Sequence, residues 1–298
     1  FFAEISREKC LNFVDKATNA SVLLRIGHKN SIKDCWDNNR LSFGCAANWI
    51  HYANKGNVTT GDSCECVFSR IPKGKAVDLF DRNGKRIEAN LQRFLDDKDP
   101  NFEFLRYVPT MLTPALCFYS LSHATPDDGL FVWDETRNMP VFRADRYAQY
   151  MGYANKEMGV LLIQDLRGLI SDLKKQIPIA IKENRYNLTQ ERYHVSAPTE
   201  EVLFANTIDY SRHQRFDIFE EEPVPPEELF WKFPEYKKQA ELRIVIPHWN
   251  FIQSYDPFKP EKYDKKKNYL PVNLPQLHSY ASLFIPSEQR LEGRFWKR

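Results

Sequence analysis

Hydrophobic residues recur along this chain with two spacings, one typical of helices and one typical of strands. Helical spacing marks residues 5–18, where the apolar positions fall on one face. Short apolar runs at 21–27, 113–122 and 159–163 predict buried strands, since each is brief and bounded by turn-forming or polar residues. Residues 237–246 alternate polar and apolar positions and predict the longest strand of the C-terminal half.

Weaker patterns fill the remaining stretches. Further helices are predicted at 31–36, 144–155 and 166–176, further strands at 41–43 and 193–195, and a hairpin at 75–86. The acidic stretch 220–230 is expected to be a loop, with helix or turn resuming near Glu227, and the lysine-rich stretch after Pro247 is expected to be irregular. Helices and strands alternate only loosely, with no fixed repeat and no linker. The sequence therefore predicts an α+β fold in one elaborated domain spanning 1–298, and not a doubly wound parallel sheet.

The composition narrows the class of protein. The 298 residues are 42% hydrophobic and 14% aromatic, too rich in core-forming residues for a disordered chain. A formal net charge of +2 does not indicate a strongly basic nucleic-acid clamp. No apolar run approaches the roughly 18 residues of a membrane helix, and the first residues lack a secretory signal. Six scattered cysteines fit a reducing compartment, so a cytoplasmic protein without membrane contact is expected.

Arg25 is the first residue with candidate chemistry. It stands inside the apolar run Leu23–Ile26, just before Gly27, where a guanidinium is costly unless a partner compensates it. The arginine could lie on a solvent face or in a buried ion pair. It could equally present a planar fork of donors to phosphate or ribose oxygens.

Two further polar sets lie on later strands. Ser120 and Ser122 share one face of the strand at 113–122, and Tyr119 lies on the other face. Gln239 and Glu241 likewise share a face of the strand at 237–246. Polar caps on an edge strand, or a solvent-exposed strand face, would also explain these positions.

Taken in order, an early arginine, a middle serine motif and a late Gln-x-Glu resemble the R-S-E class of ADP-ribosyltransferases. Ser120-Leu121-Ser122 stands where that family usually has Ser-Thr-Ser. Gly61-Asp62-x-x-Glu65 and Gln239-x-Glu241-x-Arg243 are also similar to motifs of bacterial toxin and anti-phage defence proteins. The gap between Ser122 and Glu241 is longer than in compact family members, so insertions would occupy residues 124–235.

The resemblance implies a split β-sandwich of mixed or antiparallel sheets with flanking helices, and NAD as substrate. Glu241 would stabilise the oxocarbenium-like ribose, Ser120 would position it, and Gln239 would orient the acceptor. Residues implied to bind NAD are Arg25, Ser122, Tyr119 and Gly27. Gln in place of Glu at 239 favours a nucleic acid or a non-arginine side chain as acceptor. A toxin of this class implies an antitoxin and a chaperone as partners.

Other chemistries remain open at this stage. Cys45, His51, Cys64 and Cys66 could bind zinc, although Cys-x-Cys is not the usual knuckle spacing, and no metal is expected. Asp62, Glu65 and Glu241 could belong to a metal-dependent nuclease, or the fold could be a catalytically inactive ligand-binding module. No Gly-x-Ser-x-Gly elbow supports a serine hydrolase. The basic, aromatic C-terminal end could contact RNA or DNA (Lys262, Lys265, Lys266, Lys267, Arg294, Trp296, Lys297 and Arg298).

Overall fold

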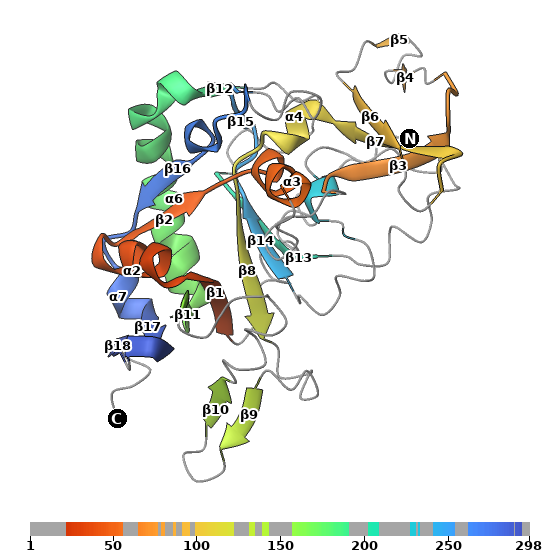
Figure 1. Ribbon diagram of the computed structural model, residues 1–298. Helices are drawn as coiled ribbons and strands as arrows, with labels where there is room; N and C mark the ends of the chain where they lie inside the picture. The colour runs from red at the N-terminus through yellow and green to blue at the C-terminus, as the bar shows by residue number, and fades with distance from the viewer. Residues whose placement is uncertain are drawn as a thin grey trace.

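A seven-stranded antiparallel sheet is the centre of the molecule (Figure 1). The computed structural model describes residues 22–55, 65–76, 79–80, 86–87, 91–95, 99–121, 131–134, 139–142, 157–190, 202–208, 227–230, 232, 241–253, 262–288 and 290–293. In spatial order the strands of this main sheet are β13 (Phe204–Thr207), β14 (Glu241–Val245), β8 (Ala115–Leu121), β1 (Val22–His28), β11 (Met158–Ile163), β17 (Ala281–Ile285) and β18 (Arg290–Gly293). Each neighbouring pair is antiparallel.

Five smaller sheets surround the main one in the described part of the chain. They are β3–β7–β6 (Val67–Pro72, Phe102–Tyr107, Leu91–Leu95), β16–β2 (Leu270–Asn273, Arg40–Phe43), β12–β15 (Leu188–Gln190, Trp249–Phe251), β10–β9 (Met139–Phe142, Phe131–Asp134) and β4–β5 (Leu79–Phe80, Arg86–Ile87). Their described pairs are antiparallel as well. The three-stranded sheet β3–β7–β6 lies on the opposite side of the molecule from β17 and β18 (Figure 1).

Helical segments connect and cover these sheets. They are α2 (Lys29–Asp37), α3 (Ala46–Asn54), α4 (Val108–Met111), α6 (Leu166–Glu183), α7 (Leu277–Tyr280) and the short 3-10 segments η3 (Arg185–Asn187), η5 (Glu227–Phe230), η8 (Lys265–Lys267) and η9 (Pro286–Glu288). Asp165 caps α6, because its carboxylate accepts a hydrogen bond from the Gly168 amide. The main core joins residues from Leu23 to Ile285, so both ends of the described chain contribute to it.

Close packing holds α2 on the main sheet. Gly27 of β1 and Gly159 of β11 are paired neighbours in the ladder. A Cβ at Gly159 would lie 2.9 Å from the Ile32 Cβ and 3.1 Å from the Lys29 Cα, so α2 approaches as near as a glycine permits.

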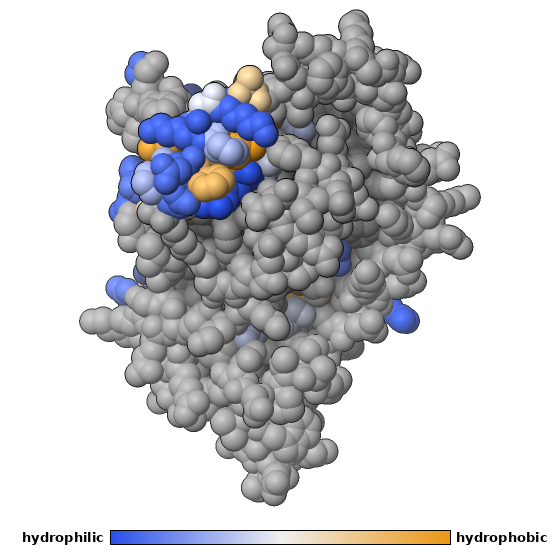
Figure 2. Space-filling model, turned by 90° about the vertical axis from the view of Figure 1, so that its right-hand side faces the viewer, coloured by the Kyte–Doolittle hydropathy of each residue, from blue (hydrophilic) through white to orange (hydrophobic). Residues whose placement is uncertain are grey.

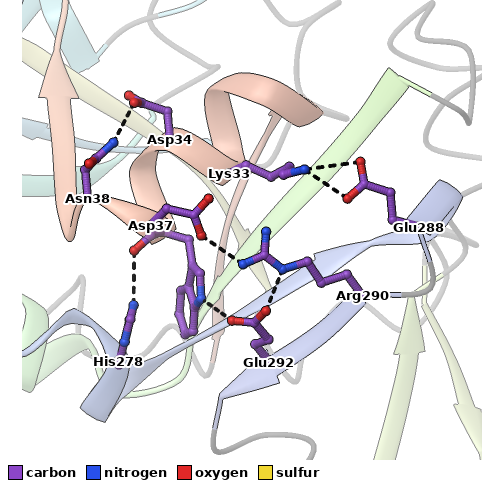
Figure 3. Close-up of polar contacts among 9 residues, drawn as sticks. Lys33, Asp34, Asp37, Asn38, His278, Glu288, Arg290 and Glu292 are labelled. Atoms are coloured by element: carbon purple, nitrogen blue, oxygen red, sulfur yellow. Dashed lines mark hydrogen bonds and ion pairs between the residues drawn. The ribbon is translucent and has the colours of Figure 1, made fainter.

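Polar contacts tie the same helix to the edge strand β18 (Figure 3). The Trp36 indole donates to Glu292 at 2.7 Å, and Arg290 contacts both Glu292 and Asp37. Lys33 binds Glu288 at 3.1 Å, and the His278 ring stacks on Trp36. These contacts explain how a strand from the end of the chain is fixed beside an early helix.

The structure shows a mixed α+β protein with mostly antiparallel sheets, as the sequence predicts. The strands expected at 21–27, 41–43, 113–122 and 159–163 are present. The hairpin expected at 75–86 is present as the pair β4–β5, from Leu79 to Ile87. The strand expected at 237–246 is described from Glu241 to Val245. The elements expected at 5–18, 144–155 and 193–195 lie outside the described residues.

Two expectations about these elements are wrong. Helix α6 was expected to end at Gln176, before Pro178, yet it continues to Glu183. Proline costs one backbone hydrogen bond, but Ala180 and Ile181 continue the buried inner face of the helix beyond it. The stretch after Pro247 was expected to be irregular, yet it contains four strands and a helix.

Candidate functional site

The three strands expected to carry the active site lie side by side. Strand β8 pairs with β1 on one edge and with β14 on the other. Arg25, Ser120 and Glu241 therefore belong to three consecutive strands of the main sheet, although they are far apart in sequence. Gln239 and Ser122 lie outside the described residues.

The register, however, places these side chains on different faces. Ser120 is opposite Leu23, and Arg25 follows Leu23 by two residues, so Arg25, Gly27 and Ser120 share one face. Glu241 is opposite Tyr119, which lies on the other face. A one-residue offset reverses the side to which a strand residue points. The expected cleft containing Arg25, Ser120 and Glu241 together is therefore not formed.

On its own face Glu241 belongs to a buried group of four charged side chains, which we call the charge cluster: Glu65, Lys232, Glu241 and Arg243. The Arg243 guanidinium, fully buried, is its centre. Both terminal nitrogens donate to the two oxygens of Glu65, at 2.8 and 2.7 Å, in a bidentate pair. Its Nε donates to Glu241 at 2.7 Å, and a terminal nitrogen also donates to the Leu229 carbonyl at 2.6 Å.

Lys232 completes the charge cluster. Its ammonium lies 2.8 Å from Glu241 and 3.3 Å from Glu65. Two carboxylates thus meet two cations, so the charges balance, as burial in a region of low polarity requires. Glu241 and Lys232 retain 8% and 6% exposure, whereas Glu65 and Arg243 retain 1% and 0%. The Glu241–Lys232 pair is consequently the side of the cluster nearest to solvent.

Neighbouring groups add to this arrangement. The Arg243 guanidinium lies over the Trp49 ring of α3, 4.6 Å from its centroid. Burial and the charge of Glu241 raise the pKa of the Cys117 thiol well above its ordinary value. The thiol therefore stays protonated at neutral pH and hydrogen-bonds to Glu241.

Glu241 itself is held in its ionised form. Burial acts to raise the pKa of its carboxyl group. The charges of Arg243 and Lys232, together with hydrogen bonds from Arg243 and Cys117, outweigh burial and lower the pKa well below its ordinary value of 4.5. The site thus holds an ionised, buried carboxylate whose charge is balanced by Arg243 and Lys232.

Arg25 lies in a separate environment on the other face. It is partly exposed and donates to the Cys117 carbonyl at 2.9 Å. Burial raises the pKa values of the Tyr269 hydroxyl and the Cys35 thiol, and the positive charge of Arg25 counteracts part of this rise. No contact links Arg25 to the charge cluster among the described side-chain contacts.

Metal chemistry finds no support in the described part of the chain. No three His, Cys, Asp or Glu side chains gather there in a way that could hold an ion. Cys45 contacts the Tyr263 hydroxyl, and Glu65 and Glu241 are already neutralised by cations. Cys64 and Asp62 lie outside the described residues.

The sequence motifs predict part of the charge cluster. Glu65 and the Glu241-x-Arg243 pair were recognised as two separate motifs, and the structure joins them. Lys232 was missed as a member, and Trp49 and Cys117 were missed as its neighbours. Lys232 follows an acidic stretch and offered no signal, because its partners are distant in sequence.

Comparison with known proteins identifies no relative. No known protein family, curated protein or solved structure matches this chain. In the described helices, none is both long and apolar enough to cross a membrane.

Proposed function

We propose that this chain is an NAD-consuming ADP-ribosyltransferase of the toxin or effector type, with a split-sandwich fold and with Glu241 as its reacting carboxylate. One observation carries the proposal: Glu241 is held ionised inside a nearly dry, charge-balanced cluster. An enzyme that stabilises a cationic ribose needs a carboxylate that stays ionised. The resemblance of Gln239-x-Glu241-x-Arg243 and of Gly61-Asp62-x-x-Glu65 to toxin motifs supports the same chemistry.

The reaction would proceed on the Tyr119 side of the sheet. The bond between ribose C1′ and the nicotinamide nitrogen breaks, and its electron pair leaves with nicotinamide. Glu241 offsets the positive charge that develops on the ribose. A nucleophilic atom of the acceptor then bonds to C1′ and releases its proton to water. Arg243 and Lys232 fix the direction of the carboxylate, and Tyr119, opposite Glu241 in the ladder, would contact the nicotinamide ring.

The decisive experiment measures nicotinamide release from labelled NAD without added metal. Glu241→Gln removes the charge with little change of shape, and we expect turnover to fall about 100-fold or more. Glu288→Gln, the same change on the exposed η9 segment, is the matched control and retains turnover. Circular dichroism of both variants separates loss of chemistry from loss of fold. Turnover that survives Glu241→Gln in a folded protein would exclude the proposal.

Arg25→Ala distinguishes this arrangement from the one expected from sequence. If Arg25 and Glu241 act on opposite faces, Arg25→Ala lowers turnover far less than Glu241→Gln. Equal losses would mean that both residues contact NAD in a common cleft.

A second candidate is a ligand-binding module without catalysis. One observation favours it: both oxygens of Glu241 are already bound by cations. In that case calorimetry detects binding of NAD, or of another anionic ligand, while no nicotinamide is released.

A further inference from the structure

Three segments that are far apart in the sequence meet near the C-terminal end of α6 (Figure 1). Strand β12 follows η3 directly and pairs with β15, and just beyond this pair the Ile252 amide donates to the Asn187 carbonyl at 3.0 Å. The next residue, Gln253, donates to the Lys262 carbonyl at 3.3 Å. Its own carbonyl accepts from Asn268, the residue after η8. The segment η3, the residues after β15, and η8 are therefore neighbours in the fold.

These neighbours expose cationic and apolar side chains. Tyr186 of η3 and Ile252 are 73% and 58% exposed, which makes them the two most exposed large hydrophobic side chains in the described part of the chain. Cations that are also exposed stand beside each of them in η3 and in the segment from Lys262 to Lys267. We call this surface the basic corner: Arg185, Tyr186, Ile252, Lys262, Lys266 and Lys267.

The cations of the basic corner are not neutralised by the described residues. None of its four cationic side chains lies within ion-pair distance of a described carboxylate. Two carboxylates, Glu183 and Asp264, are close to these cations in sequence. Asp264 accepts a hydrogen bond from the backbone amide of Lys266 at 3.1 Å and so caps η8. Four cations against two carboxylates leave the surface with a net positive charge.

Cations elsewhere on the described surface are arranged differently. Figure 2 shows the side of the molecule on which the sheet β3–β7–β6 lies, and the described residues there are mostly hydrophilic. On this sheet Arg93 is paired with Glu103 at 2.6 Å, and Arg70 with Asp99 at 3.3 Å. Unpaired positive charge beside exposed apolar side chains thus distinguishes the basic corner from this sheet.

We propose that the basic corner binds single-stranded nucleic acid. Its four cations contact the phosphates, and one base stacks on the exposed ring of Tyr186, with Ile252 as a further apolar contact. A duplex keeps its bases stacked inside and offers none to this ring. Anionic lipid would attract the same cations, but two separate apolar side chains do not form the broad apolar face with which an amphipathic helix enters a bilayer.

This binding does not depend on NAD chemistry. Only the identification of the bound strand as the acceptor of ADP-ribose would rest on the proposed function. The test is therefore made without NAD, so that it can succeed or fail independently of nicotinamide release.

The test measures fluorescence anisotropy of labelled twelve-nucleotide oligouridylate and oligothymidylate across a salt series. Arg185→Gln with Lys266→Gln removes one cation from each of two segments. We expect an affinity loss of about tenfold or more near 0.1 M salt, and a salt slope shallower by roughly 1.4, at about 0.7 per lost phosphate contact. The matched control, Lys73→Gln with Lys75→Gln, removes two exposed cations from the turn after β3 and leaves affinity within twofold.

A second variant examines stacking separately from charge. Tyr186→Ser removes the exposed ring, so affinity for single strands should fall about fivefold or more while the salt slope is unchanged. Thermal melting confirms that each variant is folded. Binding of either oligonucleotide with these losses supports the proposal, and the tighter of the two identifies the strand.

Four results would overturn the proposal. They are unchanged affinity in the variant of Arg185 and Lys266, an equal loss in the control variant, and a duplex that binds as tightly as the single strands. The fourth is binding to vesicles of phosphatidylserine and phosphatidylcholine without binding to either oligonucleotide, which would assign the basic corner to a membrane surface.

Discussion

At the scale of single residues, the charge cluster shows how burial makes four ionised groups depend on one another. Removing one member of a buried ion pair leaves an uncompensated charge. We expect Glu65→Gln to lower the free energy of unfolding by about 3–5 kcal/mol. Glu288→Gln, which breaks the partly exposed pair with Lys33, should cost less than about 1 kcal/mol.

Urea denaturation of both variants measures this difference. The double variant Glu65→Gln with Lys232→Met removes one charge of each sign, so it should recover part of the loss. Additive losses in the double variant would show that Lys232 and Glu65 do not interact energetically.

The lowered pKa of Glu241 also predicts how stability depends on pH. A carboxyl group whose pKa is lower in the folded state contributes stability above its unfolded value of about 4.5. That contribution is lost as pH falls below this value, because the unfolded chain takes up the proton first. Denaturation midpoints measured from pH 6 to pH 2.5 should therefore fall less steeply in Glu241→Gln than in the parent protein. Parallel curves would contradict this assignment.

At the scale of the elements, two paired glycines differ in what they allow. A Cβ at Gly159 would lie 2.8 Å from Ile285 and 2.9 Å from Ile32, whereas a Cβ at Gly27 would lie 3.7 Å from Ile32. Gly159→Ala should force α2 away from the sheet and cost about 1–3 kcal/mol. Gly27→Ala, the matched control in the same ladder, should change stability by less than about 0.5 kcal/mol. Similar costs for both would mean that α2 does not pack rigidly against β11.

The elements also show what a sequence pattern can and cannot predict. Strands β1, β8 and β11 were predicted because each is a short, largely apolar run that lies in the main sheet. Helix α3 was missed, since Asn48 and His51 are buried beside Ala46 and Ile50, so polar residues occupy its inner face. Strands β15 to β18 were missed because each has only three to five residues, and β16 includes a proline and β18 two charged residues.

For the candidate site, the sequence predicted that the residues lie on strands, but not how their side chains are arranged. Sequence order could place Arg25, Ser120 and Glu241 on strands, and the sheet brings these strands together. Sequence order could not give the register between the strands. A shift of one residue in that register decides which face of the sheet a side chain lies on. Pairing of Glu65 with Arg243 likewise depends on a contact between residues 178 positions apart.

At the scale of the whole molecule, strand order determines how the main sheet must unfold. Neighbours in the sheet come from distant parts of the chain, because β1 lies between β8 and β11, and β17 lies beside β11. Strand β16 likewise pairs with β2 across most of the chain. Strands from both ends of the described chain thus depend on one another for their pairing in this sheet.

We therefore predict one cooperative unfolding transition for the main sheet and its helices. Trp36 reports on α2 at the β18 edge, and Trp49 reports on α3 beside the charge cluster. Tryptophan fluorescence and far-ultraviolet circular dichroism should give the same urea midpoint. Replacing each of these tryptophans in turn by phenylalanine shows whether the two regions unfold together, with the change in each variant's stability measured by circular dichroism. Separate midpoints for the Trp36 and Trp49 signals would mean that the two sides of the sheet fold as different units, and the single-domain description would then be wrong.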